Sequence, residues 1–279
     1  MIPRRRPSRR ETPTRPPRID LIVAGCRIEL GIGAHLLDPP FGLYRSRADA
    51  AVRPDFVLDV REAPDVLPDG ADAVAPLGVR RRAGRITARG AGYRVELEPA
   101  AGDGRARIAP GSRFHRVLLQ LALTEWLAPR GGLLLHGCGL AAGGRGWLFI
   151  GPSGAGKSTV AELAGPPVLS DETCVVRLAP AGGVALAGTP IGIGTAAGPV
   201  PLAGILWLEQ APADELRPLD PGQALARFMT QVVAAGRQDA ELAPLLETAA
   251  TVLDRIPMQT LRFTRSRRFV DMLELDAEA

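Results

Sequence analysis

Lysine is almost missing from this chain of 279 residues, because Lys157 is the only one and every other strongly basic side chain is arginine. Asparagine is absent, whereas glycine (32) and proline (26) are abundant, a bias typical of a GC-rich bacterial genome. Under that bias, scattered arginines and glycines carry little functional information. A single lysine retained against it marks a position where arginine does not serve.

The shortage of cysteine and of long apolar runs excludes further classes. Cys26, Cys138 and Cys174 lack the short spacing of metal ligands and leave one residue unpaired, so we expect buried or free thiols in a reducing compartment. No apolar run approaches the ~18 residues of a membrane-spanning helix, and there is no signal-peptide core. We therefore expect a soluble, cytoplasmic protein without a membrane partner.

The net charge of +4 is unevenly distributed. Residues 1–18 contain seven arginines and one glutamate, or +6, so the remainder of the chain sums to −2. Prolines, self-repulsion and the lack of a hydrophobic period predict a disordered basic tail at 1–18. The near-neutral remainder does not predict a nucleic-acid partner.

Short apolar segments broken by glycine and proline follow the tail. Alternating and β-branched residues predict strands, and we place a small β-rich domain at 19–110, in which the basic run at 78–85 forms a solvated hairpin. Ser112 is the expected cap of the next helix, whose apolar residues recur at helical spacing. His115 lies off that apolar stripe, so we expect it to be exposed.

A phosphate-binding loop is the clearest motif. The pattern G-x-x-x-x-G-K-[ST] runs from Gly151 to Ser158, after the apolar strand WLFI and before the helical stretch STVAEL. Its amide groups and the helix N-terminus favour a phosphate. The residues expected to bind nucleotide are Gly151, Ser153, Gly154, Ala155, Gly156, Lys157, Ser158 and Thr159.

The loop also accounts for the solitary lysine. A compact ammonium group enters a ring of amides and meets phosphate oxygens as a point charge, whereas a planar guanidinium is too wide. The hydroxyl of Ser158 is the expected Mg²⁺ ligand.

An acidic pair follows at short range. Asp171 lies 14 residues after Lys157, at the end of the predicted strand VLSDE, which is near the minimum for a crossover between neighbouring parallel strands. Both loops then emerge at the carboxyl edge of the sheet, and Asp171 and Glu172 lie beside the phosphates. Glu209, which closes the strand ILWLE, is either a further site residue at this edge or an exposed acid.

Together, LLLHGCGL, GPSGAGKST and LSDE resemble the catalytic domain of HPr kinase/phosphorylase and its bacterial relatives, which include serine kinases of ribosomally made peptides such as lasso peptides. The resemblance extends over about 112–270. It implies an α/β P-loop kinase domain at 111–279, preceded by the small β-rich domain. It further implies that Asp171 is the general base, that Glu172 helps to hold Mg²⁺, and that His136 lies near the reacting phosphoryl group. From the pattern alone, a histidine on an apolar strand is more often a hydrogen-bonded core residue, and only the resemblance favours a functional His136.

The sequence departs from that family in two places. Asp171-Glu172 stands where two aspartates are common, and GTPIGIGTAAGPVP replaces the segment with which HPr kinases bind their protein partner. We therefore expect neither HPr as a substrate nor a pyrophosphate-dependent phosphorylase. The expected activity is transfer of the γ-phosphoryl group of ATP, with Mg²⁺, to a serine or threonine hydroxyl of a peptide or protein, for instance in peptide natural-product modification.

Two alternatives remain open at this point. One is a kinase of an amino acid or other small metabolite, and the other is a regulator that binds ATP without transferring phosphate. The resemblance also allows a homo-oligomer, since the related enzymes are often oligomeric.

Overall fold

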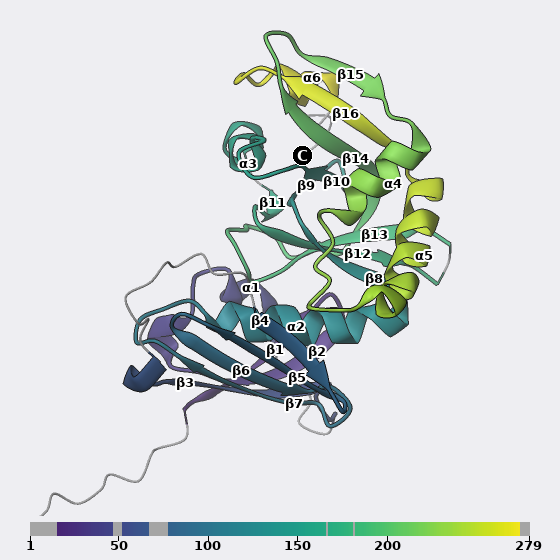
Figure 1. The fold of residues 1–279 in the computed structure, drawn as a ribbon. Coiled ribbons are helices and arrows are strands. Elements are labelled where there is room, and N and C mark those ends of the chain that lie inside the picture. Colours follow the sequence, from purple (N-terminus) through teal and green to yellow (C-terminus); the bar gives the residue numbers. More distant parts are fainter. Residues whose placement is uncertain (1–15, 47–51, 67–77, 166, 181, 274–279) are drawn as a thin grey trace, which may run out of the picture.

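The structure is a computed structural model that describes residues 16–46, 52–66, 78–165, 167–180 and 182–273. It is an α/β fold built of two sheets and their covering helices (Figure 1). Most of the predicted basic tail, residues 1–15, lies outside the described residues. In the described part of the chain, none of the helices has the length and apolar character needed to cross a membrane.

The first sheet is formed by residues 18–108. Its side chains alternate between a buried and a solvent-facing side, as in β6 (Tyr93–Glu98), where Tyr93, Val95 and Leu97 are buried between more exposed neighbours. Its strands are β1 (Arg18–Val23), β2 (Cys26–Gly31), β3 (Phe56–Glu62), β4 (Gly78–Arg82), β5 (Arg85–Gly90), β6 (Tyr93–Glu98) and β7 (Asp103–Ile108), in the order β1-β2-β3-β7-β6-β5-β4. Its short helical elements are Ala34–Leu36, α1 (Phe41–Tyr44) and Pro64–Val66.

Two details of this sheet differ from expectation. Strand β1 already begins at Arg18, whose guanidinium contacts Glu29 at 2.6 Å and Asp59 at 3.0 Å, so the tail ends before this residue. The predicted hairpin is present as β4 and β5, but it is not wholly solvated. Arg81 turns inward and donates both terminal nitrogens to Glu125 at 2.9 Å.

Helix α2 (His115–Leu127) lies between the two sheets (Figure 1). Its side chains join a core that includes residues of the first sheet together with Leu134 and Val175 of the second. The expected cap is wrong, because the helix begins after Phe114 and the Ser112 hydroxyl is buried without a hydrogen-bond partner among the described residues. His115 is fully buried and not exposed, because a helix covered on both sides has no free polar face.

The second sheet is mixed and has nine strands. Its main path runs β11-β9-β10-β14-β13-β12-β8, and β16 joins β14 in parallel and β15 in antiparallel orientation. The strands are β8 (Gly132–His136), β9 (Cys138–Ala142), β10 (Arg145–Ile150), β11 (Val168–Ser170), β12 (Thr173–Leu178), β13 (Val184–Gly188), β14 (Val200–Gln210), β15 (Glu215–Pro218) and β16 (Met258–Phe263). A short 3₁₀ helix at Ala128–Arg130 connects α2 to β8.

The predicted crossover between β10 and β11 has the expected direction. Both strands pair antiparallel with β9, so they are parallel to each other. They are not neighbours, however, because β9 lies between them. The short spacing predicts that β10 and β11 pair directly. Instead, β9 forms a hairpin with β10 and also pairs with β11, so it separates the two strands.

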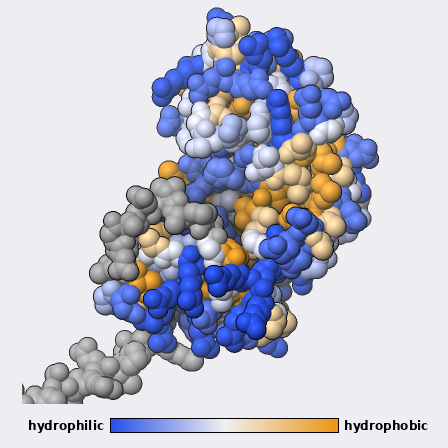
Figure 2. All heavy atoms as spheres, in the orientation of Figure 1, coloured by the Kyte–Doolittle hydropathy of each residue, from blue (hydrophilic) through white to orange (hydrophobic). Residues whose placement is uncertain are grey.

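Helices cover both faces of the second sheet. Helices α3 (Lys157–Ala164) and α6 (Arg268–Met272) share one core with Phe149, whereas α4 (Pro221–Met229) and α5 (Asp239–Arg255) share another with Leu148. The carboxylate of Asp220 accepts two amide hydrogen bonds at the start of α4 and so caps this helix. Figure 2 shows a mostly hydrophilic surface, with a hydrophobic region over α4 and α5.

The prediction of buried or free thiols is confirmed. All three cysteines are free and buried, and they come from β2, β9 and β12.

The buried imidazole of His115 makes stability depend on pH. Burial, followed by the positive charge of Arg116, lowers the pKa of His115 from 6.5 to about 4, while Asp38 opposes the shift. The folded protein thus holds a neutral ring that the unfolded chain protonates below pH 6.5. The neutral His115 ring therefore contributes fully to stability above pH 6.5. As the pH falls toward 4, this contribution is lost and the unfolding free energy decreases by about 3 kcal/mol.

We predict that His115→Leu reduces the loss of unfolding free energy between pH 7 and pH 4 by about 3 kcal/mol. Denaturant titrations at the two pH values measure it. His35→Gln is the comparison variant, because it removes an imidazole that is 63% exposed and contacts Glu62 at 2.9 Å, and its unfolding is measured at the same two pH values. An unchanged pH dependence in His115→Leu would contradict the assignment.

Candidate functional site

A cavity of about 440 Å³ opens where β8, β11 and β14 end and the loop after β10 begins. It gathers most of the residues expected from the sequence. Gly151 and Ala155 do not line it, since both are buried within the loop. The lining residues are His136, Ser153, Gly154, Gly156, Lys157, Ser158, Thr159, Asp171, Glu172 and Gln210.

The loop takes its shape from two glycines. Gly154 has φ of 81° and Gly156 has φ of 110°, backbone conformations that other residues adopt only with strain. Gly156 also lies against Phe263 of β16, so that a Cβ atom there would be 2.6 Å from the ring. Helix α3 starts directly afterwards, and its free amide groups face the loop.

Lys157 is the first residue of α3, and its side chain is folded back into the loop. Its Nζ donates to the carbonyl oxygens of Gly151 at 2.8 Å and Pro152 at 3.1 Å, and the residue is only 8% exposed. Burial lowers the pKa of this ammonium group from its usual value. A buried cation held by two neutral carbonyls gains from a bound anion, which supplies the missing countercharge.

Asp171 is held by the backbone of a distant segment. Its Oδ1 accepts the amide of Ile193 at 2.6 Å, and its own amide donates to the Ile193 carbonyl at 3.0 Å. A Cβ atom on Gly192 would lie 2.6 Å from the same Oδ1, so the approach requires glycine. Among the described residues, Oδ2 has no hydrogen-bond partner. One oxygen therefore fixes the carboxylate while the other remains available.

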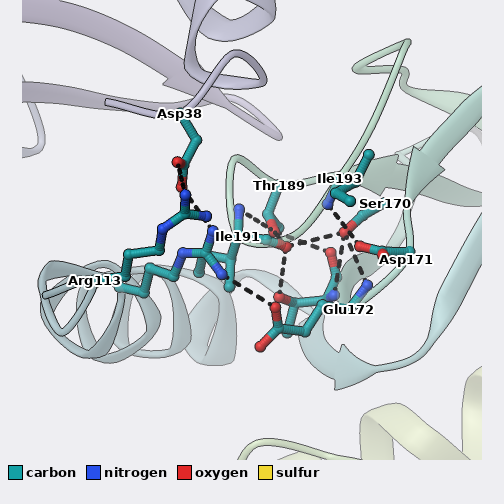
Figure 3. Close-up of polar contacts among 10 residues, drawn as sticks. Asp38, Arg113, Ser170, Asp171, Glu172, Thr189, Ile191 and Ile193 are labelled. Carbon is teal, nitrogen blue, oxygen red and sulfur yellow. Dashed lines mark hydrogen bonds and ion pairs between the residues drawn. The ribbon is translucent and has the colours of Figure 1, made fainter. Parts of the chain in front are cut away.

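Glu172 is linked to the first sheet through α2. Its carboxylate accepts a hydrogen bond from Arg116 Nη1 at 3.3 Å, and Arg116 Nη2 donates to Asp38 at 2.7 Å. Arg113 binds the other oxygen of Asp38 at 2.8 Å. Figure 3 shows this chain of charges running from Asp38 to Glu172 beside the contacts of Asp171.

His136 ends β8 at the cavity. Desolvation, followed by the positive charge of Lys157, lowers the pKa of His136, while Glu172 opposes the shift. The ring is therefore neutral near pH 7, able to donate one hydrogen bond and accept another.

Sequence reasoning missed Gln210 and left Glu209 open as either a site residue or an exposed acid. Gln210 Nε2 donates to the Gly154 carbonyl at 2.8 Å and lines the cavity. Glu209 points to the other face of β14, where it contacts Arg227 of α4 at 3.1 Å. Strand alternation separates the two side chains, so Glu209 is a paired acid outside the cavity.

The donor set limits the metal that the site could hold. Within the described ranges, no group of three His, Cys, Asp or Glu side chains converges to form a metal site. The cavity offers instead two adjacent carboxylates and the Ser158 hydroxyl. This set fits Mg²⁺ carried by a nucleotide, because Mg²⁺ takes one or two protein carboxylates and completes its shell with phosphate oxygens and water.

No family model matches this chain, and no curated protein matches it. The resemblance therefore rests on the three short segments that contribute His136, the glycine loop and the acidic pair to one cavity.

The contact between Gly156 and Phe263 predicts an asymmetry within the loop. Alanine at either glycine pays the strain of a positive φ, but only at position 156 does the new Cβ atom meet a ring, whereas at 154 it meets open space. We predict that Gly156→Ala lowers the unfolding free energy by about 1–3 kcal/mol more than Gly154→Ala. Denaturant unfolding of the two variants measures the difference, and equal losses would mean that Phe263 does not support the loop.

Proposed function

We propose that this protein is an ATP- and Mg²⁺-dependent kinase that phosphorylates a serine or threonine hydroxyl of a peptide or protein. The observation that carries the proposal is the meeting, in one cavity, of the glycine loop with Lys157 and the acidic pair of Asp171 and Glu172. In this proposal, residues 111–279 are a P-loop kinase domain of the HPr kinase type, and 19–110 are a β-rich domain preceding it.

The phosphate end of the cavity suits a nucleotide triphosphate. The loop amides and Lys157 neutralise phosphate charge, which is the main task of a phosphoryl-transfer enzyme. Ser158 and Glu172 are the residues that would hold the magnesium ion. Bound Mg-ATP supplies the transferable phosphoryl group.

The acceptor end of the cavity suits a hydroxyl group. Asp171 accepts the proton of the attacking hydroxyl at Oδ2, while the Ile193 amide on Oδ1 keeps the carboxylate in place. His136, neutral and close to Lys157, donates a hydrogen bond to the phosphoryl group in transfer. Loss of either oriented group slows transfer without emptying the phosphate loop.

A peptide acceptor is favoured by the surface beside Asp171. The side chain of Ile193 is 70% exposed although its backbone holds the base. An exposed apolar side chain next to the base provides a contact for the residues that flank an acceptor serine in a peptide. A small charged metabolite has no such flanking residues.

The direct test is to incubate the protein with labelled ATP, Mg²⁺ and peptides encoded beside its gene, and to identify products heavier by one phosphate. Transfer to a peptide supports the proposal. Transfer only to free amino acids or metabolites would make it a small-molecule kinase, and ATP binding without any transfer would make it a regulator.

We predict that Lys157→Ala lowers phosphate transfer by at least about 10²-fold and weakens ATP binding. Lys157→Arg should fail nearly as badly, because the ammonium group occupies a buried position between two carbonyls at 2.8 and 3.1 Å that a guanidinium overfills. Nucleotide titration and single-turnover transfer measure both, with Arg255→Lys, outside the cavity, as the control. An arginine variant with most of the wild-type activity would refute this explanation of the solitary lysine.

We predict that Asp171→Asn retains Mg-ATP binding but lowers transfer by about 10²-fold or more, because the amide keeps the shape of the base without its proton affinity. Glu172→Gln should mainly raise the Mg²⁺ concentration needed and have a smaller effect at saturating metal. Single-turnover transfer over a range of Mg²⁺ separates the two. If Asp171→Asn instead weakens Mg-ATP binding and leaves transfer intact, the roles of the two acids are reversed.

A further inference from the structure

Four arginines stand in one row across the first sheet. The register pairs Arg89 of β5 with Arg94 of β6, Arg94 with Arg107 of β7, and Arg107 with Arg61 of β3. Directly paired residues share a face of a sheet, so these side chains project side by side. At about 4.8 Å between strands, the row is about 15 Å long. We call these four residues the arginine row.

The row lies on the solvent face of the sheet. All four residues are exposed, and the residues that alternate with them, such as Val60, Ala88 and Val95, are buried on the side covered by α2. Arg107 contacts Asp65 at 2.7 Å. Among the described residues, the other three have no acidic partner.

The next row on the same face is built differently. It runs through Thr87, Glu96, Arg105 and Asp59, so that its charges alternate in sign from strand to strand. Like charges placed directly opposite each other destabilise a sheet, whereas opposite charges stabilise it. A compositional bias toward arginine explains scattered arginines, but it does not explain four arginines paired in register across neighbouring strands. The repulsion among these arginines therefore lowers the stability of the sheet, a cost that is common at binding surfaces.

We propose that the arginine row binds an extended acidic segment of a polypeptide partner. Each guanidinium presents a planar fork that matches a carboxylate, and the row offers such forks in a line one residue wide. The row is on the face of the sheet turned away from α2, so its partner binds apart from the candidate site. The proposal does not depend on the kinase activity.

The surroundings of the row favour a polypeptide over other polyanions. Glu96 and Asp59 lie in the adjacent row and would repel a broad negative surface such as a nucleic-acid duplex or an anionic membrane. A single-stranded nucleic acid usually stacks its bases on aromatic side chains, and the solvent face of β3, β5, β6 and β7 carries none. A narrow acidic polypeptide can contact the arginines without covering Glu96 and Asp59, and it does not need aromatic side chains for stacking.

The test compares two double variants of the full chain. Arg89→Gln with Arg94→Gln removes two charges from the row. Arg80→Gln with Arg82→Gln removes two charges from β4, on the same face of the sheet, where neither arginine belongs to the row. The six arginines of residues 1–15 contribute equally to every variant.

The probes are a fluorescent oligoglutamate, an oligouridylate of the same charge, and vesicles containing phosphatidylserine, all at physiological salt. We expect the row variant to weaken oligoglutamate binding about tenfold and the β4 variant to weaken it about twofold at most. Thermal unfolding should be unchanged or higher in the row variant, because repulsion is relieved, and the single variant Arg94→Gln provides a second test of binding.

Three results would overturn the proposal. They are equal losses in the two double variants, no measurable binding of oligoglutamate by the wild type, and tighter binding of oligouridylate or vesicles than of oligoglutamate. The last would assign the row to a nucleic acid or to a membrane surface.

Discussion

The burial of α2 on both sides is the constraint on which the rest of this structure depends. A helix between two sheets has no solvent face along most of its length, so its polar residues must pair with something or lose their charge. His115 stays neutral, and Arg116 reaches past the helix to two acids. One of them, Asp38, belongs to the first sheet's connections, and the other, Glu172, lines the cavity. The packing of a core helix thereby sets the electrostatics of a site formed by another sheet.

Local contiguity explains what the sequence could predict. The glycine loop, the strand before it and the helix after it are a single stretch, so local backbone structure alone brings Gly156, Lys157 and Ser158 together. The distance along the chain to Asp171 predicts a second loop at the same edge of the sheet, and the parallel direction of β10 and β11 agrees with that. The position of β9 between them could not be predicted, because the spacing does not reveal which strand fills a gap.

Contacts between distant segments explain what the sequence could not predict. The link from Asp38 through Arg116 to Glu172 joins three parts of the chain, and none carries a local motif for the others. Gln210 was missed for a different reason. A strand end supplies one side chain to each face, and only the register of the whole sheet decides that Gln210, and not Glu209, meets the loop. The prediction for His115 was wrong because the apolar period of a helix shows one buried face. It does not show that a second sheet covers the opposite face.

The hold of Ile193 on Asp171 has a consequence for how such a protein could change over evolution. Both hydrogen bonds come from the main chain of Ile193, and any residue other than proline supplies them equally well. The side chain at this position points outward and plays no part in them. Substitutions at position 193 can therefore change the surface beside the cavity while the Asp171 carboxylate keeps its position. In the proposed kinase, a new preference for the acceptor could then arise at this position without a change in the placement of the base.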